Sequence, residues 1–200
     1  MSNDGGAAKA SKYHVVVVAA SAGGLSALAS VLEKLPAEFP LPLGIVQHLD
    51  PHHQSMLAAI LGRRTPLRVI EARDHDSMVR GHAYVAPPGM HMVIGPAFDV
   101  QLTHTAPVHF VRPSADVLFE SAARSCGPVI AVILTGSGSD GAAGAAAVRA
   151  TGGVVIAQDQ ATSAFFGMPQ AAIDSGVVDY VLPVEKIGAA LIELTRGEAA

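Results

Sequence analysis

The first apolar run of the chain, Val15–Ala20, contains four consecutive valines and constrains the fold more than any other feature. β-Branched side chains favour a pleated strand, and a strand that is apolar at every position must be covered on both faces. Apolar residues at helical spacing follow from Leu25 to Leu35, after a turn that contains Ser21 and two glycines. A buried strand followed by an amphipathic helix is a β-α unit, and repeated units of this kind predict a parallel sheet.

The same alternation continues to the end of the chain. Further strands are expected at Leu43–Gln47, Arg68–Ala72, Val129–Leu134, Val154–Ala157 and Val178–Leu182. Further helices are expected at Gln54–Leu61, Ser114–Cys126, Gly141–Ala150, Gln170–Ser175 and Val184–Leu194. Residues 81–110 contain short strand-like pieces separated by Pro-Gly and Gly-Pro turns, which favour a β-hairpin. The predicted fold is therefore α/β: a doubly wound, mostly parallel sheet with helices on both faces and an antiparallel hairpin extension.

A chain of 200 residues suits one domain with a sizeable core. Residues 1–12 are small and polar, so we expect a disordered tail there, followed by a single domain over 13–195. The tail lacks the charged-then-apolar layout of a signal peptide, and Glu33 and Lys34 interrupt the first long apolar stretch. The protein is therefore expected to be cytoplasmic and not embedded in a membrane.

Charge and cysteine content exclude other classes of protein. The net charge is -4 and no basic run is present, which argues against a nucleic-acid partner. Cys126 is the single cysteine, so the chain forms no internal disulfide, which suits a reducing compartment. Since Cys126 precedes a strongly apolar strand, we expect a buried, unreactive thiol.

Three polar residues stand where predicted strands end: Ser21 after the first strand, His48 after the second and Asp140 after Val129–Leu134. Ligands of open parallel sheets bind beyond the carboxyl ends of the strands, so these side chains are expected together at that end of the sheet. Nucleophilic acyl transfer needs this set, because the histidine removes the serine proton and the aspartate orients the imidazole. Ser21, His48 and Asp140 are the candidate catalytic residues.

Each of these residues also has a purely structural interpretation. Ser21 precedes a helix and can cap it, although the same turn would place its hydroxyl beside free backbone N–H groups that stabilise an oxyanion. His48 can be an ordinary loop residue. Asp140 can cap the helix that starts at Gly141. Their joint occurrence at three strand ends favours the catalytic interpretation.

A glycine-rich segment indicates a second function from a different class. Gly136–Gly141 fits G-x-G-x-x-G between a strand and a helix, and Asp159 ends the next strand 18 residues later. This is the layout of a dinucleotide-binding module or oxidoreductase. The carboxylate of Asp140 argues against it, because it would repel the pyrophosphate at low dielectric.

A metal site is the third alternative. Nitrogen and oxygen ligands at short spacing suit zinc. Such residues occur at His48, Asp50, His52 and His53, and His75 lies between Asp74 and Asp76. Pro51 breaks the geometry of a helical ligand pair, so solvated loop residues are the better interpretation and no metal is expected.

Two other polar residues have weaker signals. His91 begins a strand-like piece, and its position is compatible with the same edge or with the surface. Asp116 lies in the first turn of the helix that Ser114 is expected to cap, where its charge complements the helix dipole.

Six ordered motifs give the chain a strong resemblance to the catalytic domain of the CheB family, the chemotaxis protein-glutamate methylesterases. They are Val18–Gly24, Val46–His48, Gly81–Pro87, Arg112–Phe119, Leu134–Gly141 and Gln158–Ser163 with Gly167–Pro169. The similarity runs from about Tyr13 to Leu194 and implies that 13–195 is a doubly wound methylesterase catalytic domain.

The resemblance implies the roles and the reaction. Ser21 matches the nucleophile of a Ser-His-Asp triad, His48 its general base and Asp140 the orienting carboxylate. The implied reaction is hydrolysis of glutamate γ-methyl esters on chemoreceptor cytoplasmic helices, which releases methanol, together with deamidation of glutamines. The partners would be methyl-accepting chemoreceptors, and neither a cofactor nor a metal is required.

The sequence departs from the family pattern at three positions. Ala19 stands where glycine is usual, Ala22 where threonine is common and Ser137 where methionine is frequent. Ala22 still supplies a backbone N–H, so these changes affect the pocket wall rather than the reaction class. The usual family protein also has an N-terminal phospho-receiver domain, whereas about twelve residues precede the first strand here. We therefore expect either a stand-alone enzyme or a fragment.

Overall fold

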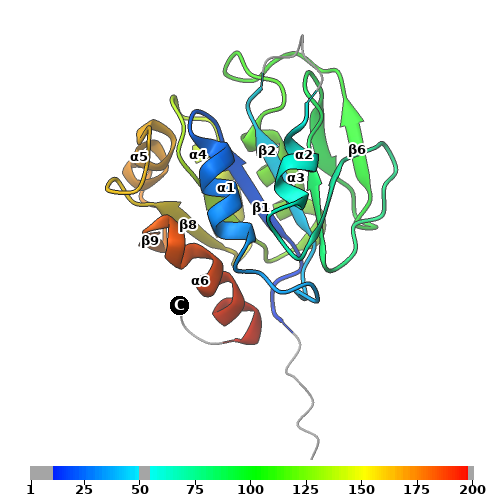
Figure 1. Cartoon of the computed structure of the whole chain (residues 1–200). Coiled ribbons are helices and arrows are strands. Elements are labelled where there is room, and N and C mark those ends of the chain that lie inside the picture. The colour runs from blue at the N-terminus through cyan, green and yellow to red at the C-terminus, as the bar shows by residue number, and fades with distance from the viewer. Residues whose placement is uncertain (1–10, 50–54, 198–200) are drawn as a thin grey trace, which may run out of the picture.

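A seven-stranded parallel sheet with the strand order β3-β4-β2-β1-β7-β8-β9 forms the centre of the molecule (Figure 1). The computed structural model describes residues 11–49 and 55–197. The strands are β1 (Val16–Ala20), β2 (Leu43–Gln47), β3 (Arg68–Glu71), β4 (His82–Val85), β7 (Ile130–Ile133), β8 (Val154–Gln158) and β9 (Tyr180–Leu182). All neighbouring strands of this sheet pair in parallel, as the repeated β-α pattern predicts.

Helices cover both faces of the sheet. On one face lie α1 (Gly24–Leu32), α2 (Leu57–Gly62) and α6 (Val184–Arg196). On the other lie α3 (Ala115–Cys126), α4 (Ala142–Ala150) and α5 (Gly167–Asp174). The resulting three-layer arrangement confirms the predicted doubly wound α/β fold.

The central strand β1 explains the run of valines. Val16, Val18 and Ala20 face the core under α1 and α6, and all three are fully buried. The alternate residues Val17 and Ala19 are equally buried in the core under α3 and α4. Because successive side chains of a strand point to opposite faces, only a continuous apolar run can serve both cores.

The region predicted to form a hairpin divides between two sheets. Strands β5 (His91–Ile94) and β6 (Val100–Thr103) pair antiparallel as a separate two-stranded sheet, which packs on α3. β4 instead joins the main sheet in parallel between β3 and β2. Its Ala83, Tyr84 and Val85 are buried, so this short run needs cover on both faces, which a surface hairpin does not provide.

Other predicted boundaries shift by a few residues. The first helix ends at Leu32 rather than Leu35, and α2 begins at Leu57, whereas its predicted start, Gln54, lies outside the described residues. Residues 1–10 of the predicted tail also lie outside the described residues. Cys126 is buried as expected, and burial raises the pKa of its thiol to about 11.

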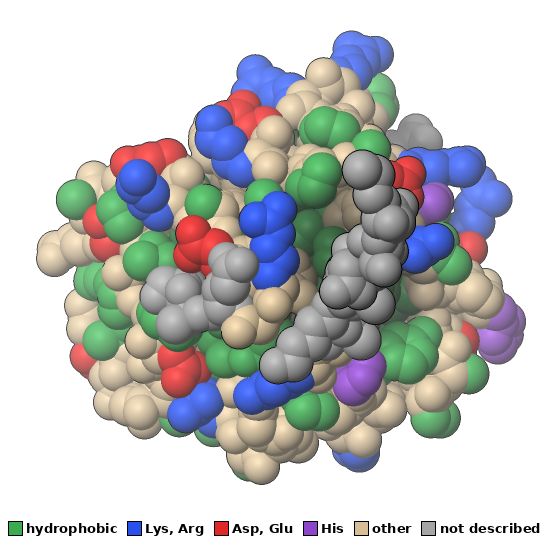
Figure 2. All heavy atoms as spheres, turned by 90° about the horizontal axis from the view of Figure 1, so that it is seen from below, with side chains coloured by type: hydrophobic (Ala, Val, Ile, Leu, Met, Phe, Trp, Pro, Cys, Tyr) green, Lys and Arg blue, Asp and Glu red, His purple; other side chains and the backbone are tan. Residues whose placement is uncertain are grey.

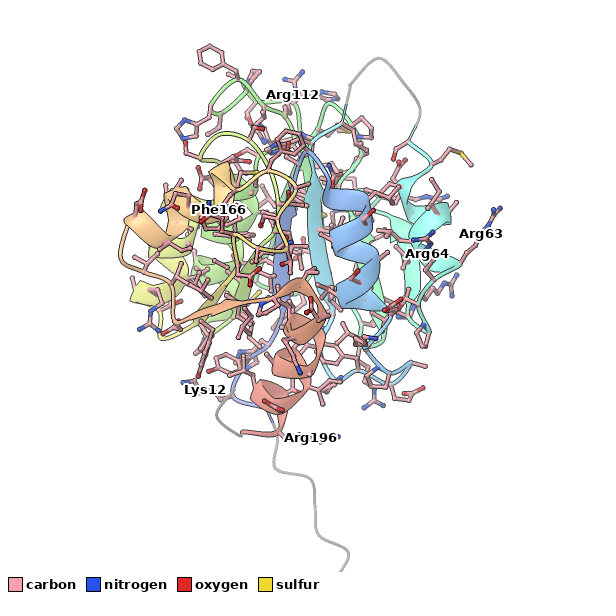
Figure 3. The ribbon with its side chains drawn as sticks, turned by 60° about the vertical axis from the view of Figure 1, so that its left-hand side comes forward. Lys12, Arg63, Arg64, Arg112, Phe166 and Arg196 are labelled. Carbon is pink, nitrogen blue, oxygen red and sulfur yellow. The ribbon has the colours of Figure 1, made fainter. Side chains whose placement is uncertain are left out.

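The surface carries dispersed charge. On the face shown in Figure 2, the described lysine and arginine side chains alternate with acidic and hydrophobic ones and form no continuous basic stripe. The labelled Arg63 and Arg64 project from the edge of the molecule beside α2 (Figure 3). Within residues 11–49 and 55–197, no helix is both long and apolar enough to cross a lipid bilayer.

The strand order reverses direction at β1. The chain leaves β1 for β2 on one side and, after α3, returns to β7 on the other side. The loops after β1 and β7 therefore diverge at the carboxyl end of the sheet, which opens a crevice between them. This is the end of the sheet at which Ser21, His48 and Asp140 lie.

Gly188 is expected to be essential for the packing of α6 on α1. A Cβ atom at this position would lie 2.6 Å from Lys34 Cβ and 2.8 Å from the Val31 carbonyl oxygen. Gly188→Ala should therefore lower the free energy of unfolding by about 1–3 kcal/mol, measured by urea denaturation. The exposed neighbour provides the control, since Ala189→Ser should change it by less than about 0.5 kcal/mol. Equal stability of the two variants would contradict the close contact.

Candidate active site

Three adjacent strands bring the predicted residues to the carboxyl end of the sheet. β1 pairs with β2 on one side and with β7 on the other, so the segments that follow these strands are neighbours. The His48 N–H donates to the Ala20 carbonyl at 3.1 Å, and the Ser21 N–H donates to the Thr135 carbonyl at 3.0 Å. Backbone hydrogen bonds thus extend the sheet by one residue beyond β1 and fix both Ser21 and His48 relative to it.

Ser21 does not cap the helix that follows it. The N-cap position of α1 is Gly23, which has φ of 78°, and no side chain caps this end. The Ser21 carbonyl instead accepts the Gly24 N–H at 2.9 Å, and within the described part of the chain the Ser21 hydroxyl has no hydrogen-bond partner. The turn therefore leaves a half-buried hydroxyl free at the carboxyl end of β1, beside the start of a helix.

A hydrogen bond joins His48 and Asp140, which are 92 residues apart in the sequence. His48 Nε2 lies 2.8 Å from Asp140 Oδ2, and the two side chains are only 13% and 4% exposed. A carboxylate can only accept, so Nε2 carries the hydrogen and Nδ1 keeps its lone pair. No hydrogen bond links the Ser21 hydroxyl to His48 among the described residues. Nucleophile–base contacts often shorten only when substrate is bound.

The Asp140 carboxylate accepts three more hydrogen bonds, all from the start of α3. Its Oδ1 accepts the Ser114 hydroxyl at 2.7 Å and the Asp116 N–H at 3.2 Å, and its Oδ2 accepts the Ala115 N–H at 2.6 Å. Burial alone would raise the pKa of Asp140, but the hydrogen bonds from His48, Ala115 and Ser114 outweigh it and hold this pKa below its ordinary value. Asp140 is therefore an ionised, fully hydrogen-bonded partner for His48.

The structural interpretations of Asp140 and Ser114 are wrong in their details. Asp140 does not cap α4, the helix that follows it, but occupies the amino end of α3. Ser114 holds the N-cap position of α3, yet its hydroxyl donates to Asp140 and makes no cap to its own helix. Both differences arise because α3 and α4 pack together, so that each helix start faces a polar side chain of its neighbour.

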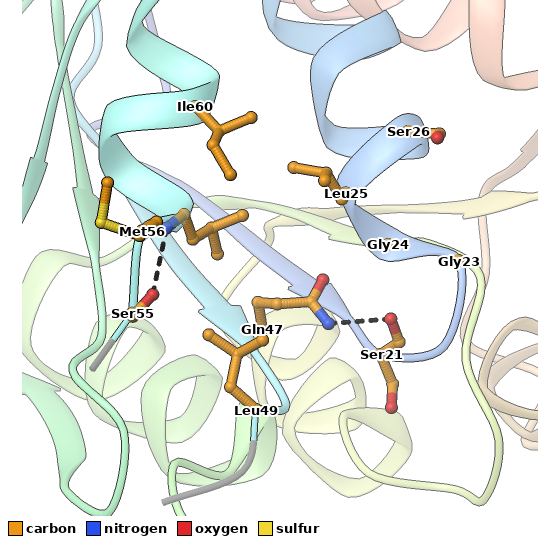
Figure 4. A pocket seen from close by; sticks show the side chains of 11 residues that line it. Ser21, Gly23, Gly24, Leu25, Ser26, Gln47, Leu49, Ser55, Met56 and Ile60 are labelled. Carbon is orange, nitrogen blue, oxygen red and sulfur yellow. Dashed lines mark hydrogen bonds between the residues drawn. The ribbon is translucent and has the colours of Figure 1, made fainter. Parts of the chain in front are cut away.

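A cavity of about 460 Å³ opens beside Ser21 (Figure 4). Its walls are mainly apolar and include Leu25 of α1, Leu49 after β2, and Met56 and Ile60 at α2. These four are among the exposed large hydrophobic side chains of the described residues. The cavity therefore suits a small, uncharged group presented by an apolar surface.

Gln47 lies between the cavity and the two predicted catalytic segments. Its side-chain amide donates to the Ser21 carbonyl at 2.8 Å (Figure 4) and to the His48 carbonyl at 3.1 Å. A Cβ atom at position 24 would overlap Gln47 Oε1 and lie 2.8 Å from Ala20 Cβ, so a larger residue there would displace the Gln47 side chain. Sequence reasoning missed this role, because Gln47 looks like the last residue of a strand.

His91 is buried beneath Ser114 rather than exposed at the edge or on the surface. Its Nδ1 accepts the Ser114 N–H at 3.1 Å, and its Nε2 lies 3.1 Å from the Ala106 carbonyl. These partners fix the neutral tautomer with the hydrogen on Nε2. His91 therefore supports the residue that donates to Asp140. Arg112, labelled at the same end of the sheet in Figure 3, donates to the carbonyls of His104 and Thr105.

The residues of the two alternative sites, the dinucleotide-binding loop and the metal site, have other surroundings or lie outside the described residues. Gly136–Gly141 connects β7 to α4, but Asp140 in this segment is directed to α3, and Asp159 accepts the N–H and hydroxyl of Thr162. Of the residues considered as metal ligands, Asp50, His52 and His53 lie outside the described ones. Within the described ranges, no group of three or more His, Cys, Asp or Glu side chains is arranged to hold a metal ion.

Comparison with known proteins gives one consistent result. The sequence profile of the CheB methylesterase family matches residues 16–191. A protein-glutamate methylesterase/protein-glutamine glutaminase of Anaeromyxobacter dehalogenans is 46% identical over 194 residues, which cover 96% of this chain and 57% of that protein. The protein-glutamate methylesterase FrzG of Myxococcus xanthus is 43% identical over 182 residues, or 90% of this chain and 54% of that protein. The chain thus spans about half the length of these curated relatives.

A solved structure agrees with the sequence matches. The crystal structure of the Thermotoga maritima CheB methylesterase catalytic domain superposes with a TM-score of 0.88 at 39% identity. The match covers 92% of this chain and 99% of that domain.

The low pKa of Asp140 has a measurable consequence for stability. A carboxylate whose pKa is lower in the folded protein than in the unfolded chain stabilises the fold above the unfolded value of about 3.9, and this stabilisation is lost as the pH falls through the folded pKa. Asp140→Asn should therefore lower the free energy of unfolding at pH 7 by about 1–3 kcal/mol, because it misplaces a buried donor.

Urea denaturation at a series of pH values tests this. The difference between wild type and Asp140→Asn should shrink steadily as the pH falls below about 4. The negative charge of Asp140 also raises the pKa of Asp116, so the comparison reports on the two neighbouring carboxylates together. A difference that is the same at pH 7 and at pH 3 would contradict the lowered pKa.

Proposed function

Because this chain belongs to the CheB methylesterase family, we propose that it is a cytoplasmic serine hydrolase that demethylates glutamate γ-methyl esters on chemoreceptor helices. The names of its relatives include both protein-glutamate methylesterase and protein-glutamine glutaminase, so the proposal extends to deamidation of glutamines. The observation that carries it is the buried His48–Asp140 hydrogen bond, one strand away from the Ser21 hydroxyl, which has no hydrogen-bond partner among residues 11–49 and 55–197.

In the first half of the reaction, Ser21 Oγ attacks the ester carbonyl while His48 Nδ1 accepts the serine proton. The bond to the methoxy group breaks, and the departing oxygen takes that proton from His48 and leaves as methanol. Asp140 stabilises the imidazolium that exists between the two proton transfers and keeps the ring in place. The product of this half is an acyl-enzyme on Ser21.

Water completes the cycle. It attacks the acyl carbonyl, gives one proton to His48 and forms the glutamate carboxyl group, and Ser21 recovers its proton when the acyl bond breaks. With glutamine as substrate, the leaving group of the first half is ammonia instead of methanol. Neither half needs a cofactor.

Backbone donors beside Ser21 support stabilisation of the tetrahedral intermediates. The Ser21 N–H is already bonded to Thr135, whereas the N–H groups of Ala22 and Gly23 donate to no group in the described part of the chain. Both stand at the start of α1, where the helix dipole favours negative charge. They are the proposed oxyanion donors.

The apolar cavity supports the choice of substrate. A glutamate methyl ester is neutral, whereas the product is an anion, and moving a charge out of water into an apolar site is costly. A pocket lined by Leu25, Leu49 and Ile60 therefore accepts the ester more readily than the carboxylate. The same exposed apolar side chains suit contact with the apolar stripe of an amphipathic helix.

Loss of the nucleophile should abolish turnover. Ser21→Ala is expected to lower kcat/KM for methanol release from a methylated chemoreceptor by at least about a thousandfold. Ser30→Ala is the control: it changes a partly buried serine of α1, the helix that follows Ser21, and should keep kcat/KM within about threefold of wild type. Turnover at the wild-type rate by Ser21→Ala would exclude Ser21 as the nucleophile.

A charge in the cavity should weaken substrate binding without disabling the chemistry. Leu25→Asp is expected to raise KM at least about tenfold, while the rate at which a small fluorophosphonate labels Ser21 stays within about threefold. Val79→Asp is the matched control, because Val79 has a similar exposure, 46% against 40% for Leu25, but does not line the cavity. An equal rise in KM for both variants would argue against the cavity as the binding site.

A further inference from the structure

The starts of α3 and α4 exchange their capping side chains. The amino end of α3 is capped by Asp140, which precedes α4 in the chain and accepts the Ala115 and Asp116 N–H groups. The amino end of α4 is capped by Asp116 of α3, whose Oδ1 accepts the Gly141 N–H at 3.0 Å and the Gly144 N–H at 2.7 Å. Neither helix has a cap from its own N-cap side chain. Each carboxylate therefore depends on the helix that carries the other.

The close approach of the two helices requires glycine on α4. A Cβ atom at position 144 would lie 2.6 Å from Phe119 Cβ and 3.0 Å from Asp116 Cα. Gly141 has φ of 97°, which L side chains rarely adopt. These two glycines place the free N–H groups of α4 against Asp116, so the exchange is built into the backbone and does not arise from side chains alone.

We infer that Asp116 is a positioning residue for the proposed reaction: it holds the start of α4, and hence Asp140, against α3 and His48. The inference rests on the proposed function for its role in turnover. Asp116 is 3% exposed and touches none of the proposed reacting atoms. Its effect passes through Gly141, the residue next to Asp140, so a small movement at Asp116 moves the carboxylate that orients the imidazole.

The carboxylate of Asp116 is buried beside a second carboxylate, an environment that disfavours its charge. Its Oδ2 is buried and has no hydrogen-bond partner within the described residues, and His109 Nε2 lies 3.4 Å from it. Burial and the negative charge of Asp140 raise the pKa of Asp116, although the N–H groups of Gly144 and Gly141 and the nearby His109 lower it. The hydrogen bonds from the Gly144 and Gly141 N–H groups, together with His109, are therefore the interactions that favour the ionised carboxylate.

Two substitutions separate the acceptor from the charge. Asp116→Asn keeps a carbonyl oxygen for the two N–H groups of α4, whereas Asp116→Ala removes the acceptor altogether. We expect Asp116→Ala to lower kcat about 10- to 100-fold with KM within about threefold, and Asp116→Asn to restore kcat to within about threefold of wild type. The low-field proton NMR resonance of His48 Nε2–H should broaden or vanish in Asp116→Ala and persist in Asp116→Asn.

Asp179→Ala is the control for loss of a carboxylate that accepts a backbone N–H far from the site. Asp179 also accepts a backbone N–H, that of Val155 at 2.8 Å, and pairs with Arg149. It lies away from the site, just before β9, the outermost strand of the sheet. This variant should lose stability yet keep both the resonance and kcat. A merely structural role for Asp116 would make Asp116→Ala behave like Asp179→Ala.

The resonance needs no substrate, so it decides the inference even if wild type releases no methanol, an outcome that would overturn the proposed function alone. An unchanged resonance in folded Asp116→Ala, or equal impairment of Asp116→Asn and Asp116→Ala, would overturn the inference. If Asp116→Ala does not fold, Gly144→Ala decides: it keeps both carboxylates but pushes α4 away from Asp116. The expected result is a weakened resonance, and an unchanged one in folded Gly144→Ala would overturn the inference.

Discussion

The Asp140 carboxylate is the group on which the rest of the site depends. It takes hydrogen bonds from His48 and from Ser114, Ala115 and Asp116 at the start of α3. A buried charge is costly unless its lone pairs are filled, and four donors from two separate segments fill them here. The same bonds therefore keep Asp140 ionised, fix the imidazole of His48 and join α3 to the carboxyl end of the sheet.

The sheet topology makes this convergence possible. Reversal of the strand order at β1 sends β2 to one side and β7 to the other, so Ser21 and the His48–Asp140 pair lie at the same end of the sheet although they are widely separated in the sequence. Glycines then set the distances. Gly23 and Gly24 turn the chain tightly after Ser21, and Gly144 lets α4 approach α3 closely. The geometry of the proposed triad is thus determined by backbone packing, which is more rigid than long side chains on a surface loop.

The apolar cavity and the polar groups at the carboxyl end of the sheet have complementary roles in the proposed reaction. The cavity excludes charge and favours a neutral ester or amide, while the N–H groups of Ala22 and Gly23 and the His48–Asp140 pair stabilise charge that develops during the reaction. Gln47 joins the two regions, since it binds the carbonyls of Ser21 and His48 from the cavity side. The two N–H groups and the His48–Asp140 pair act on the transition state more than on the bound substrate.

The sequence by itself determined the class of fold and the candidate residues. A run such as Val15–Ala20 is stable only between two apolar layers, and polar residues just after such strands must lie at the carboxyl edge of the sheet. The tertiary structure decided the strand order, the inclusion of β4 in the main sheet and the pairing of His48 with Asp140. It also decided that Asp140 caps α3 while Asp116 caps α4. Local patterns show that a cap is needed but not which chain segment supplies it, because that depends on how closely two distant helices pack.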